Sequence, residues 1–335
     1  MPRVSRAVTL TEVAKRAGVH VSTVSRALSS EAPRIGAETV DRIRLLADEM
    51  GYEPDPAAAA LRTGRSGVLG VLVPRVSDYV LATIYEGIDS SANERGYNTF
   101  VSNSNDDPPL RREKLSDLLL RRVEGVVLGD ARLDGDEMVG ILRKRGVPYV
   151  LVNRRLRGHP SVTTDDILGG RLAATHLLEL GHENVGIIAG PSYASTCAER
   201  THGFVSQFRS AGIGIDEERI IDSGTDALGG YEAGSALLAG NPNLTAIFAI
   251  NDFAAIGAMG AIREFGKVPG RDVAVVGYND VPLSSYLPVP LTSVSSPMFQ
   301  MGQEGMTMLF DLMAGREAEP KLLTPHLVAR ASTVP

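Results

Sequence analysis

Residues 9–28 read TLTEVAKRAGVHVSTVSRAL, a pattern typical of two short helices joined by a tight turn. Thr9 is a good N-cap for the first helix, and Glu12, three positions later, completes a capping box. Gly18 can adopt the left-handed conformation that ends a helix. Apolar residues at helical spacing predict the buried faces of the two helices, namely Val13, Ala14, Ala17, Val19, Val24, Ala27 and Leu28.

The outer face of the second helix is expected to carry small, hydroxylated and cationic side chains, namely Val21, Ser22, Ser25 and Arg26. Such side chains can enter the major groove of DNA and contact base edges and phosphates. An ordinary helical hairpin inside an enzyme is the alternative, because small look-alikes of this motif are common. A third amphipathic helix favours DNA binding, with apolar residues at Val40, Ile43, Ala47 and Met50 and a stop at Gly51.

The composition describes a globular chain whose charge is unevenly distributed. Its 335 residues suit two or three domains, and 43% apolar with 22% charged residues is ordinary. The net charge is −6, yet residues 1–30 hold five basic residues against Glu12 alone. A basic tip on an acidic body restricts phosphate attraction to the tip.

Neither a membrane span nor a signal peptide is expected, because no apolar run is long enough. Cys197 is the single cysteine, which excludes an internal disulfide and suits a reducing, cytoplasmic location. Cys197 is more typical of a small buried apolar residue than of a nucleophile.

Six segments carry a resemblance to a known protein family through their residue types and spacing. These segments are Val8–Leu10, Val13-Ala14, Ala17–Val19, Thr23–Arg26, Gly51-Tyr52 and Leu61–Gly64. The chain resembles the lactose-repressor/galactose-repressor family of bacterial transcription regulators. The spacing fits apart from one extra residue in the loop after Ser29. The resemblance continues through Gly190-Pro191 with Arg200, then Asn251-Asp252, and then Val276–Asp280.

The resemblance implies which residues meet DNA. Val21 and Ser22 would select the operator sequence, and the other expected contacts are Leu10, His20, Thr23, Ser25, Arg26, Arg34, Thr39 and Tyr52. His20 and Gly36 stand where the family usually has Ser as a cap. Val21 cannot hydrogen-bond a base, so it would discriminate through a thymine methyl group or through shape. Exposed helix surface without DNA contact is the alternative.

Residues 55–62 read DPAAAALR and predict a short hinge helix. Asp55 and Pro56 suit its first positions, and alanine has the strongest helix propensity. A helix of about two turns is marginal alone in water, so it needs a partner. By the resemblance, two hinges pair on DNA and Leu61 enters the minor groove, with Ala58 allowing close approach. Asp55 replaces the usual Asn, and an exposed linker helix is the alternative.

From Gly67 onward, apolar runs alternate with amphipathic helices. The expected strands include 68–73, 99–102, 125–128, 149–152, 185–189, 246–250 and 273–277, and a last strand spans 322–329. Apolar strands separated by helices indicate parallel sheets covered on both faces. The pattern restarts after about Asp165, which predicts an α/β core of two doubly wound subdomains. The resemblance implies the same architecture, similar to that of periplasmic binding proteins, in which the chain crosses between the two subdomains three times.

The expected domains are therefore a helix-turn-helix headpiece (1–53), a hinge helix and linker (54–66) and an effector-binding core (67–335). Within the core, the N-subdomain would comprise about 67–164 and 294–322, and the C-subdomain about 165–293 and 323–335. Nothing near residue 335 resembles the leucine-heptad tail of tetrameric family members, so a homodimer is expected.

Ligands of open α/β sheets bind beyond the carboxyl ends of the strands. The residues expected there to bind an effector are Ser77, Tyr79, Asp130, Asn153, Asp165, Arg200, Asn251, Phe253 and Asn279. Carboxylates, amides and Arg suit a ligand with many hydroxyl groups. For each single residue, N-capping of the next helix is an equal alternative.

Two departures from the family put its usual hexose in doubt. Asn279 replaces an Asp that often binds sugar hydroxyls, and a stacking aromatic is replaced near Asp226. The chain has no Trp, which leaves Tyr79, Tyr193 and Phe253 as alternative stacking surfaces.

The motifs of common enzymes are missing. The sequence has neither a phosphate-binding Gly-Lys-Ser/Thr loop nor a Gly-x-Ser-x-Gly elbow, and its His residues lack metal spacing. We therefore predict a DNA-binding regulator, a repressor without cofactor, controlled by a small polar effector of carbohydrate type. Its partners would be near-palindromic operator DNA and a second copy. A transport-type binding protein and a sugar-acting enzyme are the alternatives.

Overall fold

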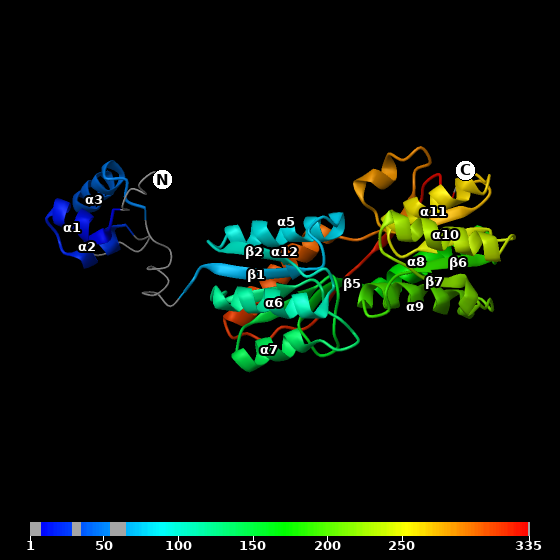
Figure 1. The fold of residues 1–335 in the computed structure, drawn as a ribbon, viewed down its shortest axis with the longest axis horizontal. Helices are drawn as coiled ribbons and strands as arrows, with labels where there is room; N and C mark the ends of the chain where they lie inside the picture. Colours follow the sequence, from blue (N-terminus) through cyan, green and yellow to red (C-terminus); the bar gives the residue numbers. More distant parts are fainter. Residues whose placement is uncertain (1–7, 29–34, 54–64, 334–335) are drawn as a thin grey trace. The chain divides into compact units, whose positions relative to one another are not determined.

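The computed structural model describes residues 8–28, 35–53 and 65–333. The chain forms two compact units, Met1–Ser66 and Gly67–Pro335 (Figure 1). The predicted hinge residues Ala58 and Leu61, and the predicted contact Arg34, lie outside the described residues.

The first unit is a bundle of three short helices, α1 (Leu10–Ala17), α2 (Val21–Ala27) and α3 (Ala37–Glu49). The predicted capping box is present, because Thr9 accepts from the Glu12 amide and the Thr9 amide donates to Glu12 at 2.8 Å. Gly18 ends α1 with a φ of 68°. The predicted apolar faces meet in one small core, which includes Val13, Ala14, Ala17, Val24, Ala27, Val40, Ile43 and Ala47.

The first sheet of the second unit has six parallel strands in the order β11-β5-β4-β3-β1-β2. They are β1 (Val68–Val73), β2 (Asn98–Asn103), β3 (Gly125–Leu128), β4 (Tyr149–Val152), β5 (Ser161–Thr164) and β11 (Lys321–Leu323). Helices α5 (Tyr79–Asn93) and α12 (Met298–Met313) cover one face. Helices α6 (Pro108–Leu120) and α7 (Glu137–Arg145) cover the other (Figure 1).

The second sheet has the order β12-β10-β9-β8-β6-β7, and only the β12–β10 pair is antiparallel. Its strands are β6 (Val185–Ala189), β7 (Ile220–Asp222), β8 (Ala246–Ala249), β9 (Ala274–Asn279), β10 (Thr292–Ser295) and β12 (His326–Val328). Helices α8 (Asp166–Glu179) and α9 (Ser195–Ser210) cover one face. Helices α10 (Ala227–Gly240) and α11 (Asp252–Glu264) cover the other. Two single 3₁₀ turns, Glu217–Arg219 and Pro282–Ser285, complete the unit. The predicted pair of doubly wound subdomains is confirmed.

The predicted last strand 322–329 is wrong as one element. It consists of β11 in the first sheet and β12 in the second, separated by Thr324 and Pro325. Pro325 has no amide hydrogen to donate, which suits a break between two pairings. The boundary expected at residues 293 and 294, between the C-subdomain and the N-subdomain, falls inside β10 of the second sheet. The chain passes from the second sheet back to the first subdomain at Ser296-Pro297, just before α12. Apolar patterning predicts a strand but not the sheet that it joins.

Three helix pairs pack closely through facing glycines. A Cβ on Gly170 of α8 would collide with the Arg200 carbonyl oxygen, and one on Gly203 of α9 would collide with that of Ile167. The pairs α10–α11 and α5–α12 meet in the same way, at Gly230 with Gly257 and at Gly87 with Gly302. Because a side chain would separate these helices, the spacing of each pair depends on its glycines.

Candidate functional site

Helix α2 presents the predicted DNA-contacting side chains. Ser22 and Arg26 are exposed, whereas Val21, Thr23 and Ser25 are half-buried. The Arg26 side chain lies along the helix, because its Nε donates to the Ser22 carbonyl oxygen at 3.1 Å.

His20 caps α2 in place of the usual Ser. Its Nδ1 accepts from the Ser22 amide at 3.3 Å and lies 2.8 Å from the Ser22 hydroxyl oxygen. Gly36 precedes α3 without a side-chain cap bond. Leu10 begins α1, Thr39 lies in the first turn of α3, and Tyr52 follows α3; all three are half-buried. The DNA-binding roles of these residues stay predictions.

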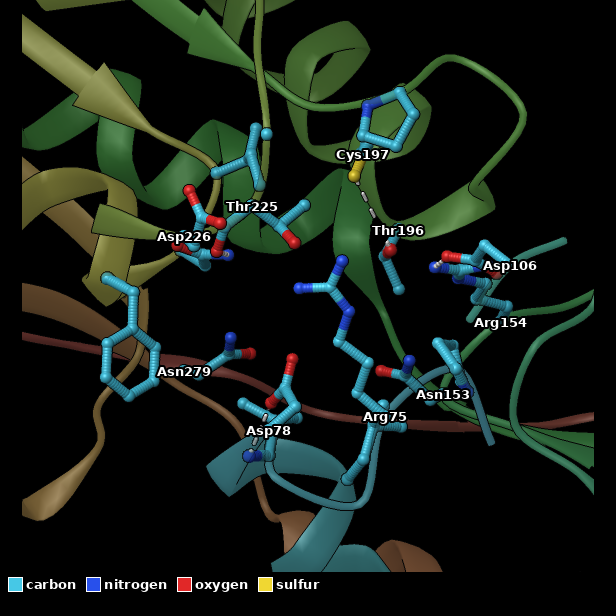
Figure 2. A pocket seen from close by; sticks show the side chains of 18 of the residues that line it. Arg75, Asp78, Asp106, Asn153, Arg154, Thr196, Cys197, Thr225, Asp226 and Asn279 are labelled. Carbon is cyan, nitrogen blue, oxygen red and sulfur yellow. Dashed lines mark hydrogen bonds and ion pairs between the residues drawn. The ribbon is translucent and has the colours of Figure 1, made fainter. Parts of the chain in front are cut away.

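A cavity of about 310 Å³ lies between the carboxyl ends of the two sheets (Figure 2). Both subdomains line it, as a ligand site between doubly wound sheets requires. Five of the nine residues expected at the effector line this cavity, namely Asn153, Arg200, Asn251, Phe253 and Asn279.

Four expected residues are not part of the lining. Asp130 is buried behind it in an ion pair with Arg111, with 2.9 Å between Nε and Oδ2. Burial raises the pKa of Asp130, and Arg111 opposes that shift. Asp165 caps α8 by accepting from the Leu168 amide at 2.9 Å. Ser77 and Tyr79 lie exposed on the turn that begins α5.

The cavity contains several polar residues beyond that expected set, namely Arg75, Asp78, Asn105, Asp106, Arg154, Thr196, Thr225 and Asp226. Asp78 and Arg154 closely follow strands, so the strand-end signal was present for them. Asn105, Asp106, Asn153 and Asn279 share another signal, because their φ angles are 52°, 55°, 63° and 96°. Asn and Asp tolerate this left-handed region better than other residues with a side chain, and such positions concentrate at functional sites.

Arg200 is held on three sides. Its Nε donates to Asp166 at 2.7 Å, its Nη1 donates to the Ile250 carbonyl oxygen at 2.8 Å, and its guanidinium lies 3.7 Å from the ring centre of Tyr278. Burial raises the pKa of Asp166, and the Arg200 charge opposes that shift. The close α8–α9 crossing brings Asp166 and Arg200 together, so Arg200 is fixed before any ligand arrives.

At the edge of the cavity, contacts around Tyr193 join the two subdomains. We call this group the rim; it consists of Tyr193, Arg132, Leu133, Asp106 and Arg154. Its carbonyl oxygen accepts from the Leu133 amide at 2.8 Å, and Arg132 lies 3.7 Å from its ring centre. Its hydroxyl donates to Asp106 at 3.4 Å. Asp106 in turn receives two bonds from Arg154, at 2.7 and 2.9 Å. These contacts tie the loop after β6 to the loops after β2, β3 and β4.

Several polar residues of the lining also cap helices. Asp78, Asp226 and Asn251 accept from amides of α5, α10 and α11 at 2.9, 2.9 and 2.8 Å. Asp252 accepts from the Ser293 hydroxyl at 2.5 Å and from the Val281 amide at 2.7 Å. Burial raises the pKa of Asp252 to about 6. Capping and lining the cavity are thus compatible, because helix N-termini point at this edge of the sheets.

The model of bacterial regulatory proteins of the lacI family matches residues 9–55, and that of a periplasmic binding protein-like domain matches residues 174–333. The transcriptional regulator DegA of Bacillus subtilis is 32% identical over 334 residues, which cover 98% of each chain. The chain belongs to the LacI family. The transcriptional repressor PurR of Photobacterium profundum is 29% identical to this LacI-family chain, over 97% of it and 98% of PurR.

Solved structures of the LacI family agree with this fold. The Lac repressor dimer bound to operator and the anti-inducer ONPF gives a TM-score of 0.90 at 27% identity, over 98% of this chain and 100% of that one. The complex of the regulator CelR with cellobiose gives a TM-score of 0.75 at 30% identity, over 97% of this chain and 99% of CelR.

This LacI-family chain is therefore a DNA-binding transcriptional regulator with a small-molecule effector, and not an enzyme. Across the described part of the chain, no helix combines the length and apolar character needed to cross a bilayer.

Proposed function

We propose that this chain is a dimeric repressor whose operator binding is controlled by a small polyhydroxylated ligand in the cleft between its two sheets. The observation that carries the proposal is the cavity at the carboxyl ends of both sheets. Asn153, Asn251, Asn279 and Thr225 lie in its wall, and their amides and hydroxyl can both donate to and accept from ligand hydroxyl groups. The regulator would act in the cytoplasm, at the nucleoid when it is bound to operator.

Helix α2 is the proposed recognition helix, with Val21 and Ser22 selecting the sequence. His20 is well suited to contact DNA because its tautomer is constrained. Nδ1 accepts the Ser22 amide hydrogen, so in the neutral ring the proton lies on Nε2. That N–H can donate to a phosphate or to a base acceptor, while the cap on α2 is kept.

A second copy of the chain is the proposed partner that aligns two headpieces on near-palindromic DNA. Leu283 and Tyr286 follow β9 and are 49% and 84% exposed. Leu283 lies on the 3₁₀ turn Pro282–Ser285 and Tyr286 is its C-cap. Exposed apolar side chains that gather in one place often mark protein interfaces, so we assign these two to the dimer contact. The ligand would then act by closing the cleft and shifting the paired subdomains.

The test is selection of bound duplexes from a palindromic library with the full chain at low salt, followed by titration with candidate ligands. We expect one consensus duplex, bound by two chains, and at least one ligand that alters its affinity. Coupling is reciprocal, so the operator must change ligand affinity by the same factor. No preference for any duplex over scrambled DNA would overturn the proposal.

Ser22→Ala and His20→Asn sharpen this test on the DNA side. Ser22→Ala should relax selection at one base position, whereas His20→Asn retains a good cap and should weaken binding to all duplexes if Nε2 contacts phosphate. An unchanged consensus and affinity in both variants would remove α2 from the recognition surface.

A further inference from the structure

The charged side chains that line the cavity differ in whether the protein itself supplies their partner. Arg154 pairs with Asp106, and Arg200 pairs with Asp166. The remaining carboxylates, Asp78, Asp226 and Asp252, each accept at least one backbone amide hydrogen. Within the described residues, Arg75 is the charged lining residue whose side chain makes no hydrogen bond or ion pair, although its carbonyl oxygen accepts from the Asp78 amide.

Arg75 projects into the space that a ligand would fill. It follows β1 and the buried Pro74, and Figure 2 shows its guanidinium in the middle of the cavity. Asn153 and Asn279 flank this space, as do residues of the first turn of α9, including Thr196. Helix α9 has no side-chain cap, so amide hydrogens of its first turn are available to oxygen atoms nearby.

Enclosing a ligand in the cleft removes water from Arg75. A guanidinium that loses water without gaining a counter-charge is strongly unfavourable. The lining carboxylates are poor counter-charges, because Asp106 is already paired with Arg154 and the helix N-termini stabilise Asp78 and Asp226 where they are. The missing negative charge is therefore best supplied by the ligand.

We propose that the effector carries an anionic group, a carboxylate or a phosphate, that Arg75 binds with two parallel N–H···O bonds. This proposal rests on the proposed function of the cleft and narrows its ligand to acidic polyhydroxylated molecules. The planar guanidinium matches both groups in geometry, which a Lys ammonium does not. The amides of Asn153 and Asn279 then bind the hydroxyl groups.

The experiment compares matched ligand pairs on the full chain by calorimetry. One arm uses D-galacturonate with D-galactose and D-gluconate with D-glucose; the other uses D-glucose 6-phosphate and D-ribose 5-phosphate with their parent sugars. We expect at least one acid to bind about ten- to a hundredfold more tightly than its neutral parent. The arm in which the preference appears distinguishes carboxylate from phosphate.

Three variants assign that preference to Arg75. Arg75→Gln should remove the preference for the acid over its neutral parent. Arg75→Lys should keep only part of that preference, because an ammonium cannot make the two parallel N–H···O bonds of a guanidinium. Arg271→Gln is the matched control, since it removes a surface charge on a side chain that is 68% exposed and should change nothing. Thermal unfolding of each variant verifies that the fold is kept.

The inference is overturned if no acid binds more tightly than its neutral parent, or if Arg75→Gln keeps the preference. A neutral sugar that releases operator with unchanged potency in Arg75→Gln would reject the anionic subsite while leaving the regulator function intact. Failure of the wild-type chain to select any duplex would instead reject the proposed function.

Discussion

The two walls of the effector cleft are built differently. The wall from the second sheet is rigid, because Arg200, Asn251, Asp252 and Asn279 are buried and the first three are hydrogen-bonded to neighbouring elements. The wall from the first sheet is made of loops, in which Arg75 and Asn105 are exposed and Asp106 is half-buried. One wall is formed in advance, whereas the other can adjust to a ligand. Substitutions in the rigid wall from the second sheet should therefore lower the stability of the fold. Substitutions in the wall from the first sheet should instead change ligand affinity.

The largest expected effect is that of Arg200→Met, which tests the rigid wall. The change leaves Asp166 buried without its ion-pair partner, and breaking such a pair costs about 3–5 kcal/mol. Urea unfolding should reveal this loss. Arg75→Gln, on the opposite wall, should stay within about 0.5 kcal/mol of the wild type. Equal losses in the two variants would remove the distinction between the walls.

Gly203→Ala tests the helix spacing behind the rigid wall. Its methyl group would collide with the Ile167 carbonyl oxygen and push α8 from α9, at a cost of about 2–3 kcal/mol. Gly140→Ala is the control, because that helical position is open and alanine there should stabilise by about 0.5–1 kcal/mol. Unfolding midpoints of both variants measure the contrast, which disappears if Gly203→Ala is as stable as the wild type.

Asp252 makes the stability of the rigid wall depend on pH. Its folded pKa of about 6 exceeds the ordinary 3.8, so the folded state holds the proton more strongly than the unfolded state does. Stability should therefore fall by about 3 kcal/mol as pH rises from about 4 to about 6, and stay lower above that. The difference in unfolding free energy between wild type and Asp252→Asn, followed across this range, isolates the effect. A difference that does not vary with pH contradicts it.

The smallest expected effect concerns the rim that connects the walls. Tyr193→Ala removes the ring against Arg132 and the bond to Asp106, contacts worth about 1 kcal/mol together. Urea unfolding should lose about 1 kcal/mol, because the folded chain already makes these contacts, and ligand affinity should fall by up to about fivefold. Tyr193→Phe retains the ring but loses the hydroxyl, so its ligand affinity should lie between those of the wild type and Tyr193→Ala. Identical affinities in all three chains would show that the rim does not influence closure.

Local patterns predicted the headpiece and the strands well, because their causes are close in sequence. The Thr9–Glu12 capping box and the stop at Gly18 involve neighbours within one turn. The predicted strands β1, β3, β4 and β6 have the bounds that the structure gives. Each depends on an apolar run whose burial on both faces needs no knowledge of distant residues.

The cleft was predicted less completely, because its composition depends on distant partners. Asp130 turns inward since Arg111 meets it from α6, a contact that no local pattern specifies. Arg75 looks like an ordinary surface residue in the sequence, and its direction is set by the loop after β1. Strand-end rules located the correct edge of each sheet but not which side chains face the cavity.

Strands β11 and β12 have a consequence for how the chain is made. Each is one of the two edge strands of its sheet, and both come from Lys321–Val328. During synthesis, neither sheet can be completed until this stretch has left the ribosome, so both subdomains wait with an open edge. A nascent chain stalled before residue 321 would leave one edge of β5 and one edge of β10 without a neighbouring strand, and such open edges attract other chains and chaperones.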